Sequence, residues 1–226
     1  MLKALLFDLD GTIANTDPIH FENWREIAAR LGKPIDLEYY QRHFSGRLNE
    51  TIVAEQFPQL TPEEGIALSQ AKEAAFRRQA AGQLQPMPGL LELLQWMDEL
   101  GLKRAAVTNA PVENVEFLLR VLNLQPYFPL VVLGDLLPKG KPDPMPYQVA
   151  LEQLGIAADE AIAFEDSPSG IRSAVGADIF TVAIASTHSP AYLAELGASL
   201  VIPDFTDLRL EAFLRAVLQS ETIALP

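Results

Sequence analysis

The chain has 226 residues, of which 49% are hydrophobic and 21% are charged, as in folded globular proteins with a sizeable core. Its formal net charge of −13 argues against binding to nucleic acid or to an anionic membrane surface, because both require clustered Lys and Arg. It contains no cysteine and no run of about 18 apolar residues, so we expect no disulfide, no cysteine chemistry and no membrane span, and we expect a cytoplasmic protein.

Short apolar runs predict the strands of a buried sheet. The first run, residues 5–7, leads directly into Asp8 and Asp10. The runs do not alternate cleanly between apolar and polar residues, as is typical of strands buried on both faces of a parallel sheet. The later runs lie at residues 104–107, 130–133, 161–164, 179–183 and 200–202.

Helical patterns lie between these runs. Residues 90–100 carry apolar side chains at helical spacing and end before Gly101, which suits a helix C-terminus. Residues 115–122 and 147–154 show the same spacing. Strand followed by helix, repeated from about residue 86 onward, predicts an α/β fold with a doubly wound (Rossmann-like) parallel sheet.

The segment of residues 17–85 interrupts this pattern with helices alone. Asp17 and Pro18 open one helix, and the sequence Thr61-Pro62-Glu63-Glu64 opens a long second one as an N-cap, an N1 proline and a capping box. Residues 85–89 are rich in proline and read as a return linker. We therefore predict a core domain over residues 1–16 and 86–226, with an all-helical domain over residues 17–85 inserted into it.

The two aspartates after the first strand form a candidate site. Ligands of open α/β sheets bind beyond the carboxyl ends of the strands, where Asp8 and Asp10 are expected. Two carboxylates this close cannot both ionise cheaply without a cation or a shared proton. Taken alone, the motif has an equal alternative interpretation as a helix-capping turn.

Three further strand ends carry polar residues. Thr108 and Asn109 precede a helix, where a hydroxyl and free N–H groups favour an anion. Lys141 precedes another helix, and a fourth strand ends on Glu165 and Asp166. Each feature alone has a structural interpretation, as a cap or a solvated side chain. Together, their hard oxygen ligands indicate a Mg²⁺ site.

These motifs resemble those of a known family. FDLDGT (7–12), VTN (107–109), KP (141–142) and FEDSPSG (164–170) are similar to the four ordered motifs of the haloacid dehalogenase-like hydrolases. The helical insertion resembles the cap domain of that superfamily, so that the resemblance spans essentially the whole chain.

The resemblance implies a role for each motif residue. Asp8 would be the nucleophile that forms an aspartyl-phosphate, and Asp10 the general acid–base. Lys141 would bridge the phosphate and Asp8, with Thr108 and Asn109 binding phosphoryl oxygens. The expected Mg²⁺ ligands are Asp8, Asp10 through its backbone carbonyl, Asp166, and Glu165 either directly or beside the ion.

The cap residues indicate a subgroup. NTDPIHFENW (15–24) resembles the cap start of β-phosphoglucomutase-like proteins, which include sugar phosphatases and phosphoglycolate phosphatases. His20 matches a histidine that links proton transfer to cap closure in the mutase, although a simple polar role on a cap helix is an alternative. The mutase holds the distal phosphate with an arginine three positions after a glycine. Here Arg47 follows Gly46 directly and Asn49 takes the arginine position, which favours a phosphatase. Arg77 and Arg78 are expected to be solvated.

The sequence thus predicts a Mg²⁺-dependent phosphatase acting on a small phosphorylated metabolite, either a sugar phosphate or phosphoglycolate. A β-phosphoglucomutase that interconverts β-glucose 1-phosphate and glucose 6-phosphate is the alternative. Two other functions fit the sequence less well. A dehalogenase would need neither Asp10 nor the acidic pair Glu165 and Asp166. A phospho-accepting signalling module would not carry a cap. We expect a monomer, because the cap must open and close.

Overall fold

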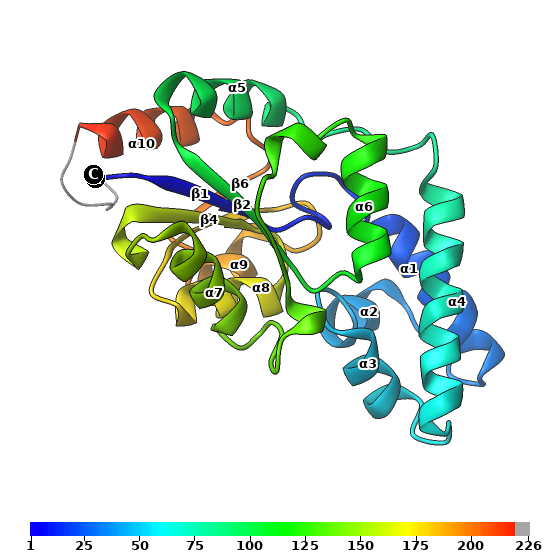
Figure 1. The fold of residues 1–226 in the computed structure, drawn as a ribbon. Coiled ribbons are helices and arrows are strands. Elements are labelled where there is room, and N and C mark those ends of the chain that lie inside the picture. The colour runs from blue at the N-terminus through cyan, green and yellow to red at the C-terminus, as the bar shows by residue number, and fades with distance from the viewer. Residues whose placement is uncertain (220–226) are drawn as a thin grey trace.

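The computed structural model describes residues 1–219 and contains one six-stranded sheet (Figure 1). The strand order is β3-β2-β1-β4-β5-β6, and every pair of neighbours is parallel. This is the predicted doubly wound α/β fold. The strands are β1 (Ala4–Phe7), β2 (Lys103–Thr108), β3 (Val131–Leu133), β4 (Ala161–Glu165), β5 (Phe180–Ile184) and β6 (Leu200–Ile202).

Strand β1 lies at the centre of the sheet, and all four of its residues are buried. Its last residue, Phe7, is in register with Ala106 on β2 and with Phe164 on β4. The chain builds the sheet outward from β1, first to one edge and then to the other, so that the strand order reverses between β1 and β4. Ligands of such sheets bind in the crevice at the carboxyl ends beside this reversal.

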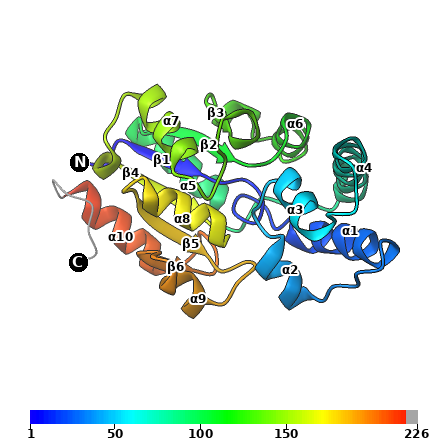
Figure 2. The ribbon, with the colours of Figure 1, turned by 90° about the horizontal axis from the view of Figure 1, so that it is seen from below.

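Helices cover both faces of the sheet because successive strand residues point to opposite sides. Leu5 and Phe7 pack with α5, α6 and α10, whereas Ala4 and Leu6 pack with α7 and α8 on the other face (Figures 1 and 2). The core helices are α5 (Leu90–Leu100), α6 (Val112–Val121), α7 (Met145–Leu154), α8 (Pro168–Gly176), α9 (Pro190–Glu195) and α10 (Leu208–Leu218).

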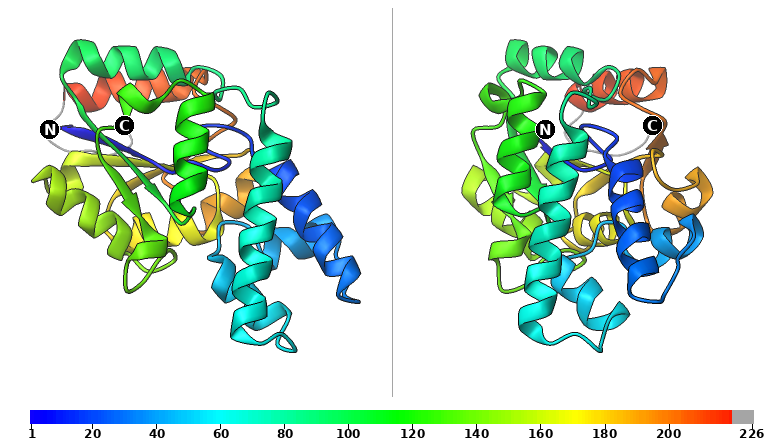
Figure 3. Two further views of the ribbon diagram at one scale, coloured as in Figure 1. Left: turned by 45° about the vertical axis from the view of Figure 1, so that its right-hand side comes forward. Right: turned by 90° about the vertical axis from the view of Figure 1, so that its right-hand side faces the viewer.

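The insertion lies beyond the carboxyl ends of the strands (Figure 3). Its helices have a hydrophobic cluster of their own, which includes Trp24, Phe44 and Phe57. The capping box predicted at Thr61 and Glu64 is confirmed. The four helices are α1 (Asp17–Arg30), α2 (Leu37–His43), α3 (Asn49–Gln56) and α4 (Pro62–Ala80).

Most predicted elements are confirmed, with small shifts at their ends. Helix α5 stops before Gly101, whose φ of 63° lies in the left-handed region that glycine tolerates best. Helix α6 starts at Val112, three residues before the first apolar residue of its pattern. The division of the chain into domains at residues 16 and 86 stays a prediction, and residues 220–226 of the predicted core domain lie outside the described residues. Within residues 1–219, no helix is long and apolar enough to span a membrane.

Two leucines on α5 provide a test of the packing. Leu94 is fully buried in the main cluster, whereas Leu91 on the same helix is 40% exposed. Leu94→Ala should lower the free energy of unfolding by about 2–5 kcal/mol, because it removes apolar contacts and leaves a cavity. Denaturant titration measures this loss. Leu91→Ala serves as the matched control, with an expected loss of roughly 0.5 kcal/mol or less.

Candidate active site

Asp8 and Lys141 form a buried ion pair at the end of β1. The Nζ atom of Lys141 lies 2.6 Å from Asp8 Oδ1, 2.6 Å from Glu165 Oε1 and 2.6 Å from the carbonyl oxygen of Val107. Burial raises the pKa of Asp8 to about 8, with Lys141 opposing the rise and Glu165 adding to it. For Lys141, burial lowers the pKa, but the two carboxylates outweigh it and the net pKa is raised. The lysine therefore stays charged and holds Asp8 in place.

Three buried carboxylates meet beside this lysine. Asp8, Glu165 and Asp166 each offer an oxygen, and these oxygens lie within 4.8 Å of one another. Burial, followed by the charges of Asp8 and Glu165, raises the pKa of Asp166 well above its ordinary value. Glu165 Oε1 accepts hydrogen bonds from Lys141 and from Tyr147, but its Oε2 is buried without a hydrogen-bond partner among the described residues. Three carboxylates that repel one another, one of which has an oxygen atom without a hydrogen-bond partner among the described residues, fit a divalent cation.

Asp10 faces the cap instead of the lysine. Its Oδ1 accepts a hydrogen bond from Thr16 at 2.7 Å and lies 3.3 Å from His20 Nε2. Burial raises the pKa of Asp10, but hydrogen bonds and charge from His20, together with the Thr16 hydrogen bond, bring it below its ordinary value. The two aspartates, two residues apart, therefore have separate partners and separate electrostatic environments.

A chain of polar contacts extends from Asp10 into helix α4. His20 Nδ1 lies 2.8 Å from Lys72 Nζ, which donates to Glu73 Oε1 at 2.8 Å. The ring of His20 stacks on Phe76, with ring centroids 3.9 Å apart. His20, which the sequence analysis left between two interpretations, thus connects the acid–base candidate Asp10 to the cap.

Thr108 and Asn109 lie at the end of β2. The hydroxyl of buried Thr108 accepts a hydrogen bond from the Ala110 backbone N–H at 3.0 Å. The side chain of Asn109 accepts from the backbone N–H of Lys141 at 2.9 Å and donates to its carbonyl oxygen at 3.0 Å. The Asn109 side chain therefore fixes the loop that carries the lysine.

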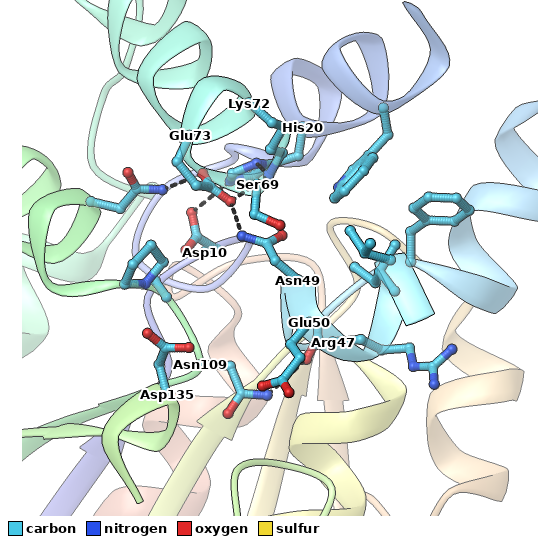
Figure 4. A pocket seen from close by; sticks show the side chains of 18 of the residues that line it. Asp10, His20, Arg47, Asn49, Glu50, Ser69, Lys72, Glu73, Asn109 and Asp135 are labelled. Atoms are coloured by element: carbon cyan, nitrogen blue, oxygen red, sulfur yellow. Dashed lines mark hydrogen bonds and ion pairs between the residues drawn. The ribbon is translucent and has the colours of Figure 1, made fainter. Parts of the chain in front are cut away.

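A cavity of about 1100 Å³ lies between the core and the cap. The predicted residues that line it are Asp8, Asp10, His20, Arg47, Asn49, Thr108, Asn109, Lys141 and Asp166. Glu165 lies behind this lining with no exposed surface. Figure 4 shows Asp10, His20, Lys72 and Glu73 close together on one side of the pocket.

Two predicted cap residues are engaged with other side chains. Arg47 makes two hydrogen bonds to Glu55, at 2.9 and 2.6 Å, and its guanidinium points away from the pocket (Figure 4). Asn49 donates to Glu73 Oε1 at 2.7 Å. Neither side chain is free to hold a distal phosphate in this arrangement.

The sequence matches the family model of the haloacid dehalogenase-like hydrolases over residues 5–184, a range that includes every residue of the site described above. The chain belongs to the haloacid dehalogenase-like hydrolase family. The helical insertion, α1 to α4, is called the cap here, and the cavity lies between it and the sheet.

Relatives within the family carry phosphatase names. The chain is 32% identical to validoxylamine A 7'-phosphate phosphatase from Streptomyces hygroscopicus subsp. limoneus, covering 92% of this chain and 97% of that protein. It is also 32% identical to a phosphorylated carbohydrates phosphatase from Thermotoga maritima, with 90% and 95% coverage. A variant of CbbY from Rhodobacter sphaeroides, solved with xylulose-(1,5)bisphosphate, has a TM-score of 0.81 at 27% identity, covering 92% of this chain and 96% of that chain.

Sequence reasoning missed the α4 residues of the site. Lys72 and Glu73 are buried although they belong to a helix rich in Ala and Gln. Lys72 lies four residues before the buried Phe76, and this placement of a charge on the apolar face was the available signal. Arg77 is half-buried and donates to Asn114 at 2.7 Å, so the expectation that it is solvated was wrong.

Glu73 predicts a pH-dependent stability. Burial raises its pKa, but Lys72 and His20 outweigh burial and lower the pKa from 4.5 to about 2. A carboxylate whose pKa is lower in the folded state stabilises the fold at every pH above its pKa in the unfolded chain. For Glu73 this stabilisation is roughly 3 kcal/mol, and it is lost as the pH falls from about 5 toward about 2. Glu73→Gln should therefore be less stable than the wild type at about pH 7, and the difference should narrow at about pH 3.

Denaturant unfolding at the two pH values measures this difference. Glu116→Gln, on the exposed face of α6, is the control and should match the wild type at both. If the difference in free energy of unfolding between wild type and Glu73→Gln stays constant with pH, the lowered pKa of Glu73 is contradicted.

Proposed function

We propose that this chain is a Mg²⁺-dependent phosphatase that hydrolyses a small phosphorylated metabolite, a sugar phosphate or phosphoglycolate, through an aspartyl-phosphate on Asp8. One observation carries the proposal. Asp8 lines the cavity with its carboxylate held at 2.6 Å by buried Lys141, while Asp10 faces the same cavity with different partners. This is the separation of nucleophile and acid–base that covalent phosphoryl transfer requires.

In the first half-reaction, an oxygen of Asp8 attacks phosphorus as the bond from phosphorus to the alcohol oxygen breaks. Asp10 acts here in its protonated form, which its lowered pKa makes a strong acid, and it delivers a proton to the departing oxygen, so that a neutral alcohol leaves. The contact between Asp10 and His20 at 3.3 Å gives this carboxylate a neighbouring group with which to share that proton. Lys141 neutralises charge on the nucleophile and on the phosphoryl group.

In the second half-reaction, Asp10 removes a proton from a water molecule that attacks phosphorus. The bond between phosphorus and the Asp8 oxygen breaks, inorganic phosphate leaves and the Asp8 carboxylate is regenerated. The hydroxyl of Thr108 and the backbone N–H of Asn109, at the end of β2, are the proposed ligands of the phosphoryl oxygens. The cap excludes bulk water from the cavity while this happens.

The proposed Mg²⁺ ligands are Asp8, the backbone carbonyl of Asp10, Asp166 and Glu165. The unpaired Glu165 Oε2 and the mutual repulsion of the three carboxylates support this choice. A bound cation supplies positive charge that lets Asp8 ionise beside an anionic phosphoryl group.

The charges around the cavity favour a phosphatase over the alternative β-phosphoglucomutase. Among the described residues that line the cavity, eight are Asp or Glu and four are Lys or Arg. Lys141, Lys72 and Arg47 are each paired with carboxylates. The mutase must hold a second phosphate group. Of the four cations, Arg77 is the one without a carboxylate partner among the described residues, so a second phosphate would have one unpaired cation to bind. We therefore propose a monophosphate as substrate and a water molecule as acceptor.

The proposal also includes the setting of the enzyme. A chain without cysteine suits the reducing cytoplasm, where we place it. We propose that it acts as a monomer, because the cavity is formed by the cap and core of one chain.

Replacing the nucleophile tests the mechanism. Asp8→Asn should lower phosphate release by roughly 10³-fold or more, since an amide cannot form the covalent intermediate. A panel of glucose 6-phosphate, phosphoglycolate and p-nitrophenyl phosphate, each with Mg²⁺ and with EDTA, measures the effect. EDTA should abolish turnover by the wild type, and Mg²⁺ should restore it. Asp159→Asn, an exposed position away from the cavity, should keep wild-type activity. An Asp8→Asn variant with full activity would overturn the mechanism.

A second assay separates the phosphatase from the mutase. The enzyme is incubated with β-glucose 1-phosphate and a small amount of glucose 1,6-bisphosphate, and both inorganic phosphate and glucose 6-phosphate are followed. We expect phosphate to accumulate and glucose 6-phosphate to stay at background. Efficient formation of glucose 6-phosphate without phosphate release would show that a sugar hydroxyl, not water, is the acceptor.

A further inference from the structure

Asn114 joins the core to the cap through both ends of its side-chain amide. It lies on core helix α6 and is 1% exposed. Its Nδ2 donates to Glu73 Oε2 at 2.6 Å, and its Oδ1 accepts from Arg77 Nη1 at 2.7 Å. Glu73 and Arg77 are four residues apart and therefore lie on one face of α4. A single buried amide thus clamps this face of the cap helix to the core.

The clamp is continuous with the acid–base side of the site. Glu73 accepts from Asn114 through Oε2 and from Lys72 through Oε1, and Lys72 contacts His20, which contacts Asp10. Glu73 is 6% exposed and Lys72 is 4% exposed. Because buried polar groups are costly to leave unpaired, each member of this chain restricts the position of the next.

We propose that Asn114 is a positioning residue for the reaction, which fixes Glu73 and, through Lys72 and His20, sets the orientation of Asp10. This inference rests on the proposed function, because it requires Asp10 to act as the acid–base. A primary amide suits the position, since it donates to a carboxylate on one side and accepts from a guanidinium on the other. The lowered pKa of Glu73 keeps that carboxylate ionised as the acceptor.

The inference also connects cap closure with proton transfer. Helix α6 starts three residues after Asn109, so Asn114 belongs to the same core segment as the proposed phosphate-binding end of β2. Lys72 and Glu73 belong to the cap. The hydrogen bonds from Asn114 to α4 are therefore among those that join the cap to the core, and they are continuous with the contacts that orient Asp10.

Dependence on the leaving group tests this role. Asn114→Ala should lower kcat/KM for an alkyl phosphate by roughly 10- to 100-fold, because its leaving oxygen needs a proton from a well-placed Asp10. The loss for p-nitrophenyl phosphate should be about 3-fold or less, because this leaving group departs readily as an anion. The alkyl phosphate is glucose 6-phosphate or phosphoglycolate, whichever the wild type hydrolyses faster.

Asn23→Ala is the matched control. Asn23 is also buried, and its amide donates to the carbonyl oxygen of Ile19 and to the side chain of Gln79, both within the cap. Neither hydrogen bond involves a residue of the series of polar contacts that links Asn114 to Asp10. Both substrates should respond to this variant by the same factor.

A charge swap adds a rescue. Asn114→Asp alone faces Glu73 with a second carboxylate and should lower kcat/KM for the alkyl phosphate at least as much as Asn114→Ala. Adding Glu73→Gln reverses the direction of the hydrogen bond between the two positions and should restore the ratio of the two kcat/KM values to within about threefold of wild type. This comparison stands even if Asn114→Ala does not fold.

The outcomes separate the two proposals. Wild-type protein that releases no phosphate from any substrate would overturn the proposed function. An active wild type, combined with equal losses for both substrates in Asn114→Ala or no rescue by the swap, would overturn the positioning role and leave the phosphatase intact.

Discussion

The repulsion among buried carboxylates at the ends of β1 and β4 is the constraint on which the rest of the site depends. Asp8, Glu165 and Asp166 are brought together by the register of two adjacent parallel strands, and one ammonium group, that of Lys141, contacts two of them. Such a cluster needs compensating positive charge or a shared proton. Burial, together with the neighbouring carboxylates, raises the pKa values of Asp8 and Asp166, and for Asp8 the charge of Lys141 opposes the rise without cancelling it. This cluster of buried carboxylates is the basis for the cation and for the nucleophile proposed above.

The fold serves this cluster in two ways. Building the sheet outward from β1 places the reversal of strand order next to Asp8, so that loops from four strands reach one crevice. Inserting the cap between β1 and α5 places a second set of polar residues over the same crevice, and Asp10 turns toward it through Thr16 and His20. The segment from Asp8 to Asp10 therefore lies where core and cap meet. Lys141 of the core contacts Asp8, and His20 of the cap contacts Asp10.

The strands, the parallel sheet and the helical insertion were predictable from the sequence, because buried apolar runs and capping residues act locally. The motif residues at the strand ends were predictable for the same reason, together with the family resemblance. The contacts across the cavity were not. The only local signal for Lys72 is its place four residues before Phe76, which does not reveal its partners, and Asn114 becomes notable only when α4 and α6 are placed side by side. Arg47 had suitable chemistry for a ligand, but Glu55, eight residues later, takes its guanidinium. Tertiary partners decide such cases.

The proposed chemistry requires the phosphoryl group to pass through Asp8. Rapid acid quenching of the Mg²⁺-loaded enzyme during turnover of a ³²P-labelled substrate, followed by peptide mapping, tests it most directly. We predict acid-stable, hydroxylamine-labile label on the peptide that contains Asp8, and no label in Asp8→Asn. Wild-type turnover without any covalent label, or acid-stable label on a peptide that does not contain Asp8, would contradict a phosphoryl transfer through Asp8.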